Sequence, residues 1–132
     1  MSTVVVDSGA LVDVLLTNGE QPVAATGPLA GHDLVAPHLI DVEMLNATRK
    51  LLLRREISRG YAEALLRDYK RTALELFPHK TLLEKAWALR GNITPYDAMY
   101  VALAQTLEVP LITADARLAR AAESHCTVNL LA

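Results

Sequence analysis

The feature that most limits the fold of this chain is its alternation of short apolar runs with longer segments of helical periodicity. Residues 4–6 are three consecutive valines, which favour a buried strand. Further strand-like runs follow at 33–36, 76–77, 109–112 and 126–128. Strands that alternate with helices predict an α/β fold, in which a mostly parallel central sheet is covered by helices on both faces.

Capping residues and periodicity place the helices between these strands. We expect Ser8 to cap a first helix, and Thr94 to cap a later helix that begins at Pro95. Pro37 is expected in the first turn of another helix, which continues to about residue 53. The remaining predicted helices, of which the first is weak, lie at 22–31, 58–75, 80–90 and 116–123.

Length and composition predict one globular domain over residues 1–132. The chain is 52% hydrophobic and 21% charged, which is typical of a folded protein and not of a disordered one. Its single cysteine, Cys126, excludes an internal disulfide and is expected to be a small buried hydrophobe. Neither a signal peptide nor an apolar run of about 18 residues is visible, so we expect a soluble, cytoplasmic protein without a membrane span.

Four acidic residues follow strands or open helices in this pattern. Asp7 follows the first strand directly, and Asp115 follows the run at 109–112. Glu43 is expected in the second turn of the helix after the second strand, and Asp97 in the first turn of the helix that Thr94 caps. Ligands of parallel sheets bind beyond the carboxyl ends of the strands. We therefore expect these four carboxylates to converge at one edge of the sheet.

Converging carboxylates need a compensating cation. Two like charges ~4 Å apart repel by roughly 4 kcal/mol at an effective dielectric constant of 20. Oxygen ligands without a histidine or cysteine cluster favour Mg²⁺ or Mn²⁺ over Zn²⁺. A metal in such a site neutralises phosphate charge and activates a water, which is the chemistry of phosphodiester hydrolysis. An acidic site without a metal repels nucleic acids, so we expect the activity to depend on the metal.

Each acid also has a purely structural interpretation. Asp97 suits the helix macrodipole, and Asp115 suits an ordinary helix cap. Asp41 competes with Glu43, because residues two apart on a helix point about 200° from each other and only one of them can face the site. Position alone does not decide between these two.

Four local motifs bear a stronger signal than periodicity. They are VVDSGAL at residues 5–11, APHLIDVEMLNA at 36–47, TPYDAMYVALA at 94–104 and LITADARL at 111–118. Together they resemble, in order, the four acidic motifs of PIN-domain ribonucleases, and the short chain is similar to the VapC toxins of type II toxin–antitoxin systems. The resemblance spans nearly the whole chain.

The resemblance implies a PIN-like three-layer α/β fold and an Mg²⁺- or Mn²⁺-dependent endoribonuclease. It favours Glu43 over Asp41 as the acid of the second motif. Asp7 and Asp97 are the implied direct metal ligands, and Glu43 and Asp115 complete the acidic set. Ser8 and Thr113 are implied to support these acids by hydrogen bonds.

The positive charges are concentrated in one stretch. Residues 49–71 hold eight of the thirteen lysines and arginines, whereas residues 1–48 hold none. Two interpretations are equally good. These residues, including Arg49 and Arg54, could form a positive rim that guides RNA, or they could be the solvated charges of two surface helices. Arg117 is a further candidate for a phosphate contact, although a surface helix charge is the simpler interpretation.

The resemblance also implies partners. These are a VapB-type antitoxin, whose apolar helix would lie against the helices of residues 49–71, a second copy of the chain in a homodimer, and an RNA target such as a transfer or ribosomal RNA loop. Trp87 is expected in the core or in the dimer contact. The four histidines lack ligand spacing and are expected at the surface or in loops.

Two other functions compete with the nuclease. A phosphatase of the haloacid dehalogenase type also uses an aspartate after the first strand, but it needs a second aspartate two residues later, where this chain has Gly9. A non-catalytic PIN-like protein that binds RNA or antitoxin would be expected to lack one of the acids, and all four are present.

Overall fold

A five-stranded parallel sheet forms the centre of the molecule, as the alternating pattern predicts. The structure is a computed structural model and describes residues 2–19 and 21–131. The strands lie in the order β3-β2-β1-β4-β5. Their bounds are β1 Ser2–Val6, β2 His32–Pro37, β3 Leu74–Phe77, β4 Leu111–Thr113 and β5 Val128–Leu130. The strands β4 and β5 each begin two residues later than the sequence pattern predicts.

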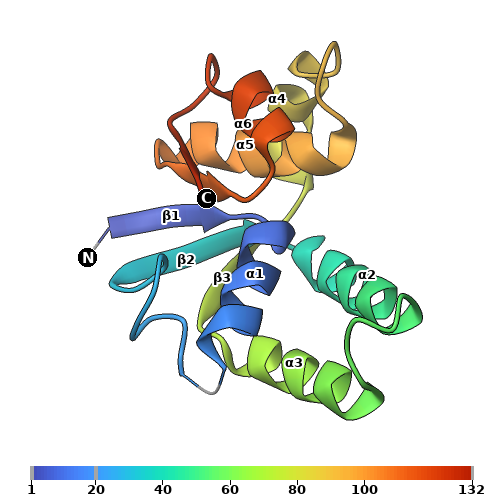
Figure 1. Ribbon diagram of the computed structural model, residues 1–132. Coiled ribbons are helices and arrows are strands. Elements are labelled where there is room, and N and C mark those ends of the chain that lie inside the picture. The colour runs from blue at the N-terminus through green and yellow to red at the C-terminus, as the bar shows by residue number, and fades with distance from the viewer. Residues whose placement is uncertain (1, 20, 132) are drawn as a thin grey trace.

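Helices cover both faces of this sheet (Figure 1). One face carries α1 Ser8–Asn18, α2 Ile40–Leu53 and α3 Arg59–Arg71. The other face carries α4 Leu83–Ala88, α5 Pro95–Leu107 and α6 Ala116–Ala122, with the short 3-10 helix η1 Lys80–Leu82 leading into α4. The result is the predicted three-layer α/β architecture.

The chain reverses its direction across the sheet at β1. It runs outward from β1 to β2 and β3, and then crosses back to place β4 on the other side of β1. In the parallel register of these two strands, Val5 pairs with Leu111 and Val6 with Ile112. The carboxyl ends of β1 and β4 therefore lie next to each other. Such a reversal point is where α/β sheets bind ligands.

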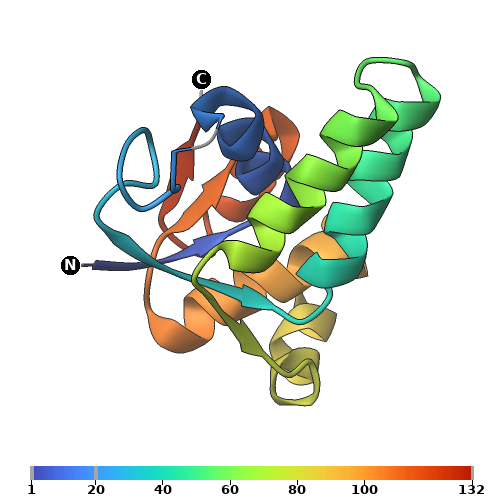
Figure 2. The ribbon, with the colours of Figure 1, turned by 90° about the horizontal axis from the view of Figure 1, so that it is seen from below.

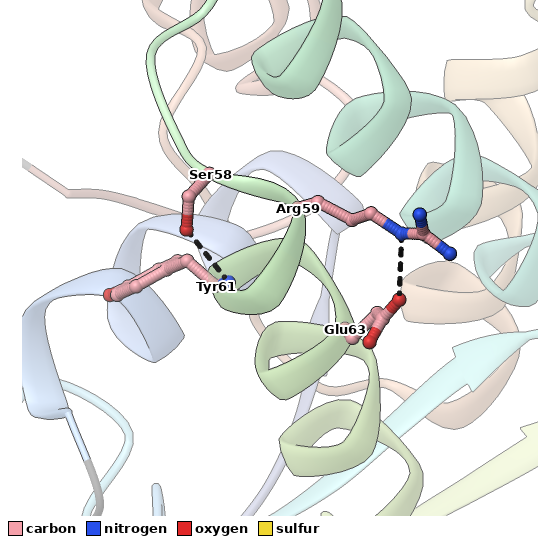
Figure 3. Close-up of polar contacts among 4 residues, drawn as sticks. All are labelled: Ser58, Arg59, Tyr61 and Glu63. Atoms are coloured by element: carbon pink, nitrogen blue, oxygen red, sulfur yellow. Dashed lines mark hydrogen bonds and ion pairs between the residues drawn. The ribbon is translucent and has the colours of Figure 1, made fainter.

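Helices α2 and α3 lie side by side and project beyond the sheet (Figure 2). Ser58 caps α3, because its hydroxyl oxygen accepts a hydrogen bond from the backbone N–H of Tyr61 at 3.1 Å. Across the first turn of the same helix, Nε of Arg59 lies 3.3 Å from Oε1 of Glu63 (Figure 3). That ion pair is largely exposed, so it adds little stability.

The core is built mainly from valine, leucine and alanine. Three polar side chains among the described residues are also buried, namely Asp7, Thr48 and Thr113. The Thr48 hydroxyl donates to the carbonyl of Met44 in its own helix, which satisfies it locally. The other two lie at the carboxyl ends of β1 and β4. Burying a polar group is costly unless it is hydrogen-bonded, so this edge of the sheet is the exception to an otherwise apolar interior.

The weak helix predicted at 22–31 is wrong, since this segment consists of turns. Gly27 and Gly31 have φ values of 83° and 78°, which a right-handed helix does not contain. The segment is fixed by other means: Leu29 is fully buried, and the side-chain amide of Asn18 donates to the carbonyl of Thr26.

The expected place of Pro37 in the first turn of a helix is also wrong. Pro37 is the last residue of β2 and pairs with Phe77 of β3, and α2 begins only at Ile40. The start of α2 is stabilised from a distant segment, because the N–H of Leu39 donates to Nε2 of His79 at 2.9 Å. The helix predicted at 58–75 ends at Arg71, since the chain turns extended at Thr72 to enter β3.

Several single residues differ from their expected surroundings. Trp87 does not lie in the core: it is 68% exposed, and the guanidinium carbon of Arg90 lies 4.6 Å from its ring centroid. Cys126 is only half-buried, and burial raises the pKa of its thiol.

Within the part of the chain that the structure describes, no helix has the length and apolar character that a membrane span requires.

Candidate acidic metal site

Asp7 occupies the reversal point of the sheet and is 7% exposed. It is the N-cap of α1, because its Oδ1 accepts from the backbone N–H of Ala10 at 2.8 Å. The prediction that Ser8 caps this helix is therefore wrong by one residue; Ser8 is the first residue of α1. The other oxygen, Oδ2, accepts a short hydrogen bond from the hydroxyl of Thr113. Both bonds fix the carboxyl group in one orientation.

The environment of Asp7 disfavours its charge. Burial raises the pKa of Asp7 from 3.8 to about 6, although the hydrogen bonds from Thr113 and from Ala10 act in the opposite direction. The negative charges of Asp97 and Glu43 raise this pKa further. An aspartate with this pKa is half protonated near pH 6, and a neighbouring cation would stabilise its charged form.

Thr113 and Asp115 bring the end of β4 to the same place. Thr113 is fully buried, and its hydroxyl oxygen accepts from the backbone N–H of Asp115 at 3.0 Å while its proton goes to Asp7. Asp115 caps α6 through Oδ1, which accepts from the N–H groups of Arg117 and Leu118 at 2.9 and 3.2 Å. The cap interpretation of Asp115 is thus confirmed, and it does not exclude a second role.

Glu43 lies in the first turn of α2 and is half-buried. Its Oε1 accepts from the phenol of Tyr100 in α5 at 2.5 Å. Burial raises the pKa of Glu43; the hydrogen bonds of Tyr100 and Ser8 lower it, and the charge of Asp97 raises it. Asp41 has a different neighbour, since its Oδ1 accepts from the phenol of Tyr69 in α3 at 2.6 Å. Of these two acids, Glu43 is the one that faces the other carboxylates.

Asp97 lies in the first turn of α5, which begins as the sequence predicts. Thr94 is the N-cap, and its hydroxyl oxygen accepts from the backbone N–H of Asp97 at 3.3 Å. Burial raises the pKa of Asp97, and the charge of Asp115 raises it further, while Thr94 lowers it. The four predicted acids are therefore linked by mutual repulsion, with Asp97 interacting with all three others.

The four acids repel one another, but they are not close enough together to surround a metal ion. Within residues 2–19 and 21–131, no three carboxylate, imidazole or thiol groups lie close enough together to hold an ion. The two findings agree physically, because Coulomb repulsion extends beyond the distance of direct ligation. An all-oxygen donor set of this kind fits Mg²⁺ or Mn²⁺, since Mg²⁺ retains several waters and takes only one or two carboxylates directly.

The predicted supporting residues divide by position. Ser8 lies near enough to Glu43 and Tyr100 to lower both pKa values, and Thr113 binds Asp7. Arg117 is exposed in the first turn of α6, beside Asp115. The exposed Arg49 and Arg54 lie farther along α2, with Arg54 as its C-cap, roughly 16 Å along the helix axis from Glu43. The structure thus places Arg54 at the opposite end of α2 from the acids.

Tyr100 is the site residue that sequence reasoning missed. Tyr100 belongs to the buried, mainly apolar stripe of α5 and is 1% exposed. Its phenol nevertheless reaches Glu43 across the boundary between two helices. Its position three residues after Asp97 is the one signal in the sequence, because residues three apart share a helix face.

A cavity of about 660 Å³ lies away from these acids. Its lining includes Thr3, Asp33, Arg71 and Glu75, which lie toward the opposite ends of the strands, and none of the four acids is among the lining residues. The acidic group is an open edge of the sheet, which suits a polymeric substrate that approaches from outside.

Comparison with known proteins identifies the family. The PIN domain model matches residues 4–124. The chain is 42% identical to Ribonuclease VapC1 of Mycobacterium tuberculosis, with 99% of each chain covered, and 34% identical to Ribonuclease VapC9 of the same organism, with 97% of this chain and 98% of the relative covered. The crystal structure of PAE2754 from Pyrobaculum aerophilum shares the fold at a TM-score of 0.66 and 20% identity, covering 96% of this chain and 89% of that one. The chain therefore belongs to the PIN-domain family, among the relatives of the VapC ribonucleases.

Proposed function

We propose that this protein is a metal-dependent endoribonuclease and the toxin of a type II toxin–antitoxin system. The observation that carries the proposal is the group of four mutually repelling acids at the reversal point of the sheet, with the pKa of the buried Asp7 raised to about 6. The kinship with proteins named ribonuclease VapC supports RNA as the substrate. Repulsion between grouped acids opposes folding, so their grouping favours a catalytic purpose.

Mg²⁺ or Mn²⁺ is the proposed cofactor, with Asp7 and Asp97 as direct ligands. Glu43 and Asp115 would act through bound waters, which is consistent with the absence of a three-residue cage within the described residues. When bound, the metal supplies a nucleophilic water and charge neutralisation at the phosphate. The protein would hold Asp7 in place through Thr113 and Ala10, and Ser8 would support Glu43.

The RNA would approach the acidic edge from the side of the exposed arginines. Arg117 in the first turn of α6 is the candidate nearest to the acids, and Arg49 and Arg54 on α2 would make more distant phosphate contacts. Because positive side chains bind phosphates without regard to sequence, these contacts would steer the substrate and not select it. The proposed substrates are loops of transfer or ribosomal RNA.

Exposed apolar side chains support two protein partners. On α2, Val42, Leu45 and Leu53 are 67%, 56% and 62% exposed, which suits the apolar helix of a VapB-type antitoxin. On the other face of the sheet, Trp87 and Tyr96 are 68% and 66% exposed, which suits a contact with a second copy of the chain in a homodimer. The protein would meet both partners and its RNA in the cytoplasm.

An aspartate-nucleophile phosphatase is not supported by the surroundings of Asp7. Position 9 carries a glycine where that mechanism needs a second acid. The nuclease therefore remains the better proposal, and a non-catalytic RNA- or antitoxin-binding protein is the alternative that activity measurements decide.

The test is cleavage of structured RNA by the purified protein with Mg²⁺ or Mn²⁺, with EDTA, and with Asp97→Asn as the matched variant. We expect discrete cleavage that EDTA and Asp97→Asn both abolish. Cleavage that survives both controls would contradict the acidic metal site. Binding of RNA without cleavage of transfer or ribosomal RNA, under conditions where the metal binds, would favour the non-catalytic alternative.

A further inference from the structure

The phenol of Tyr100 is a polar group at the end of an otherwise buried side chain. Tyr100 is 1% exposed, and α5 presents it on the same face as the apolar residues of the core. Its hydroxyl donates to Oε1 of Glu43 at 2.5 Å and so joins α5 to α2 across 57 residues of sequence. Because a buried hydroxyl without a partner is costly, this bond also fixes where the phenol points.

Glu43 depends on this bond more than Asp7 or Asp115 depends on any one partner. The carboxylates of Asp7 and Asp115 accept backbone N–H groups of the helices that they cap, and these donors cannot move independently of the helix. In the part of the chain that the structure describes, the Glu43 carboxylate accepts from the Tyr100 phenol at 2.5 Å and from no backbone N–H group. Glutamate also has one more rotatable bond than aspartate, so it has more conformational freedom to lose.

The position of Tyr100 connects two of the acids. Tyr100 follows Asp97 by three residues on α5, so the two side chains share a helix face. The same turn of α5 therefore carries one acid of the site and the donor that orients another acid on α2. Movement of α5 relative to α2 would displace both acids together.

We propose that Tyr100 is a positioning residue, whose hydroxyl holds the Glu43 carboxylate in the orientation that the metal site requires. This inference rests on the proposed function, because it assumes a metal at the acidic edge. With Oε1 engaged by Tyr100, interaction with the metal or its waters falls to Oε2 of Glu43. Tyr100 itself touches neither the metal nor the RNA.

The chain contains a matched control on the same helix. Tyr69 of α3 donates to Oδ1 of Asp41 at 2.6 Å, which reproduces the tyrosine–carboxylate pair two residues away on α2 but away from the other acids. Tyr100→Phe and Tyr69→Phe each remove one phenol oxygen and keep the ring. A general effect of losing such a bond would appear in both variants, and an effect on the metal site would appear in Tyr100→Phe alone.

The experiment is calorimetric titration of Mn²⁺ into the wild type, Tyr100→Phe, Tyr69→Phe, Glu43→Ala and the double variant of Tyr100→Phe with Glu43→Ala. We expect Tyr100→Phe to weaken Mn²⁺ binding by roughly 10- to 100-fold, as loss of outer partners of metal ligands does, and Tyr69→Phe to leave it unchanged. In the Glu43→Ala background, Tyr100→Phe should cause no further loss, because its effect passes through Glu43.

Wild-type affinity in Tyr100→Phe would overturn the inference while leaving the proposed function intact. An equal further loss in the Glu43→Ala background would also overturn it, since Tyr100 would then act through the fold. Absence of Mn²⁺ binding by the wild type would remove the proposed metal site and this inference with it. If Tyr100→Phe does not fold, Glu43→Asp withdraws the carboxylate from Tyr100 and should weaken Mn²⁺ binding similarly, with Asp41→Glu as its unaffected control.

Discussion

Helix α2 carries two carboxylates two residues apart, and each accepts a hydrogen bond from a tyrosine of a neighbouring helix. Asp41 accepts from Tyr69 of α3 at 2.6 Å, and Glu43 accepts from Tyr100 of α5 at 2.5 Å. The pairs have the same chemistry but opposite surroundings. Asp41 is exposed, whereas Glu43 is half-buried and faces Asp97.

The difference shows that the neighbours of an acid, and not its type or its local bonds, distinguish a surface pair from a site pair. Burial raises the pKa of both tyrosines, so each remains a hydrogen-bond donor at neutral pH. Of the two acids, Glu43 is the one that adds negative charge to the surroundings of Asp7.

The largest expected effect is on RNA cleavage. Glu43→Ala should reduce the cleavage rate by more than ~100-fold, because loss of even the outer partners of a metal ligand costs roughly 10- to 100-fold. Asp41→Ala removes the same kind of charge from the same helix and should leave the rate close to that of the wild type. Rates on one RNA at saturating Mn²⁺ measure both. Equal losses of cleavage rate in the two variants would contradict the distinction between Glu43 and Asp41.

The second effect concerns the stability of the metal-free protein. The folded state raises the pKa of Asp7 from 3.8 to about 6, so Asp7 contributes stability that is fully present below pH ~4 and is lost as the pH rises through about 6. Two pKa units correspond to roughly 3 kcal/mol. Asp7→Asn should therefore increase the free energy of unfolding at pH 7 by about 2 kcal/mol in EDTA.

Urea unfolding of the wild type and of Asp7→Asn at several pH values between 4 and 8 checks this sign. The difference between the two curves should grow as the pH rises, while Asp41→Asn should follow the wild type. A variant Asp7→Asn that is less stable than the wild type at pH 7 would show that Asp7 serves the fold through its hydrogen bonds to Thr113 and Ala10.

A smaller effect is stabilisation by the metal. A ligand at about ten times its Kd stabilises the folded state by roughly 1.4 kcal/mol, so Mn²⁺ should raise the Tm of the wild type. We expect the increase to persist in Asp41→Ala and to shrink in Glu43→Ala, as thermal scans with and without Mn²⁺ would show. The same increase in all three proteins would place the ion elsewhere.

The smallest effect is expected for Tyr69→Phe. The pair that it breaks is at the surface, where such changes alter the free energy of unfolding by no more than about 0.5 kcal/mol. RNA cleavage should be unchanged. A clear loss of cleavage in this variant would mean that the Asp41 side of α2 also contributes to the site, for instance by binding substrate.

Local signals predicted much of the fold. The valine run at 4–6 forms β1, and the Thr94-Pro95 pair starts α5 with the expected cap. Where distant contacts decide, prediction failed. The start of α2 depends on the pairing of Pro37 with β3 and on His79, which is 40 residues from the N–H of Leu39 that it accepts. Neither contact can be predicted from the local sequence.

The candidate site was predicted as far as topology determines it. The rule that ligands bind at the carboxyl ends of parallel strands selects Asp7 and Asp115, and the structure brings both to the reversal point. The phenol of Tyr100 was beyond prediction, because a tyrosine in an apolar stripe has the same pattern whether or not its hydroxyl meets a carboxylate. The raised pKa of Asp7 likewise depends on burial, which the sequence shows only indirectly.

Proton release on Mn²⁺ binding tests most directly whether the metal binds among the buried acids, and it is measured by calorimetry in buffers of different ionisation enthalpy at pH 6 and pH 8. Since the pKa of Asp7 is about 6, Asp7 is about half protonated at pH 6 and must lose its proton to a metal. We expect release of about half a proton or more at pH 6, almost none at pH 8, and a smaller release from Asp7→Asn than from Asp41→Asn. Binding without proton release at pH 6, or the same release from both variants, would contradict the claim that the metal binds among the buried acids.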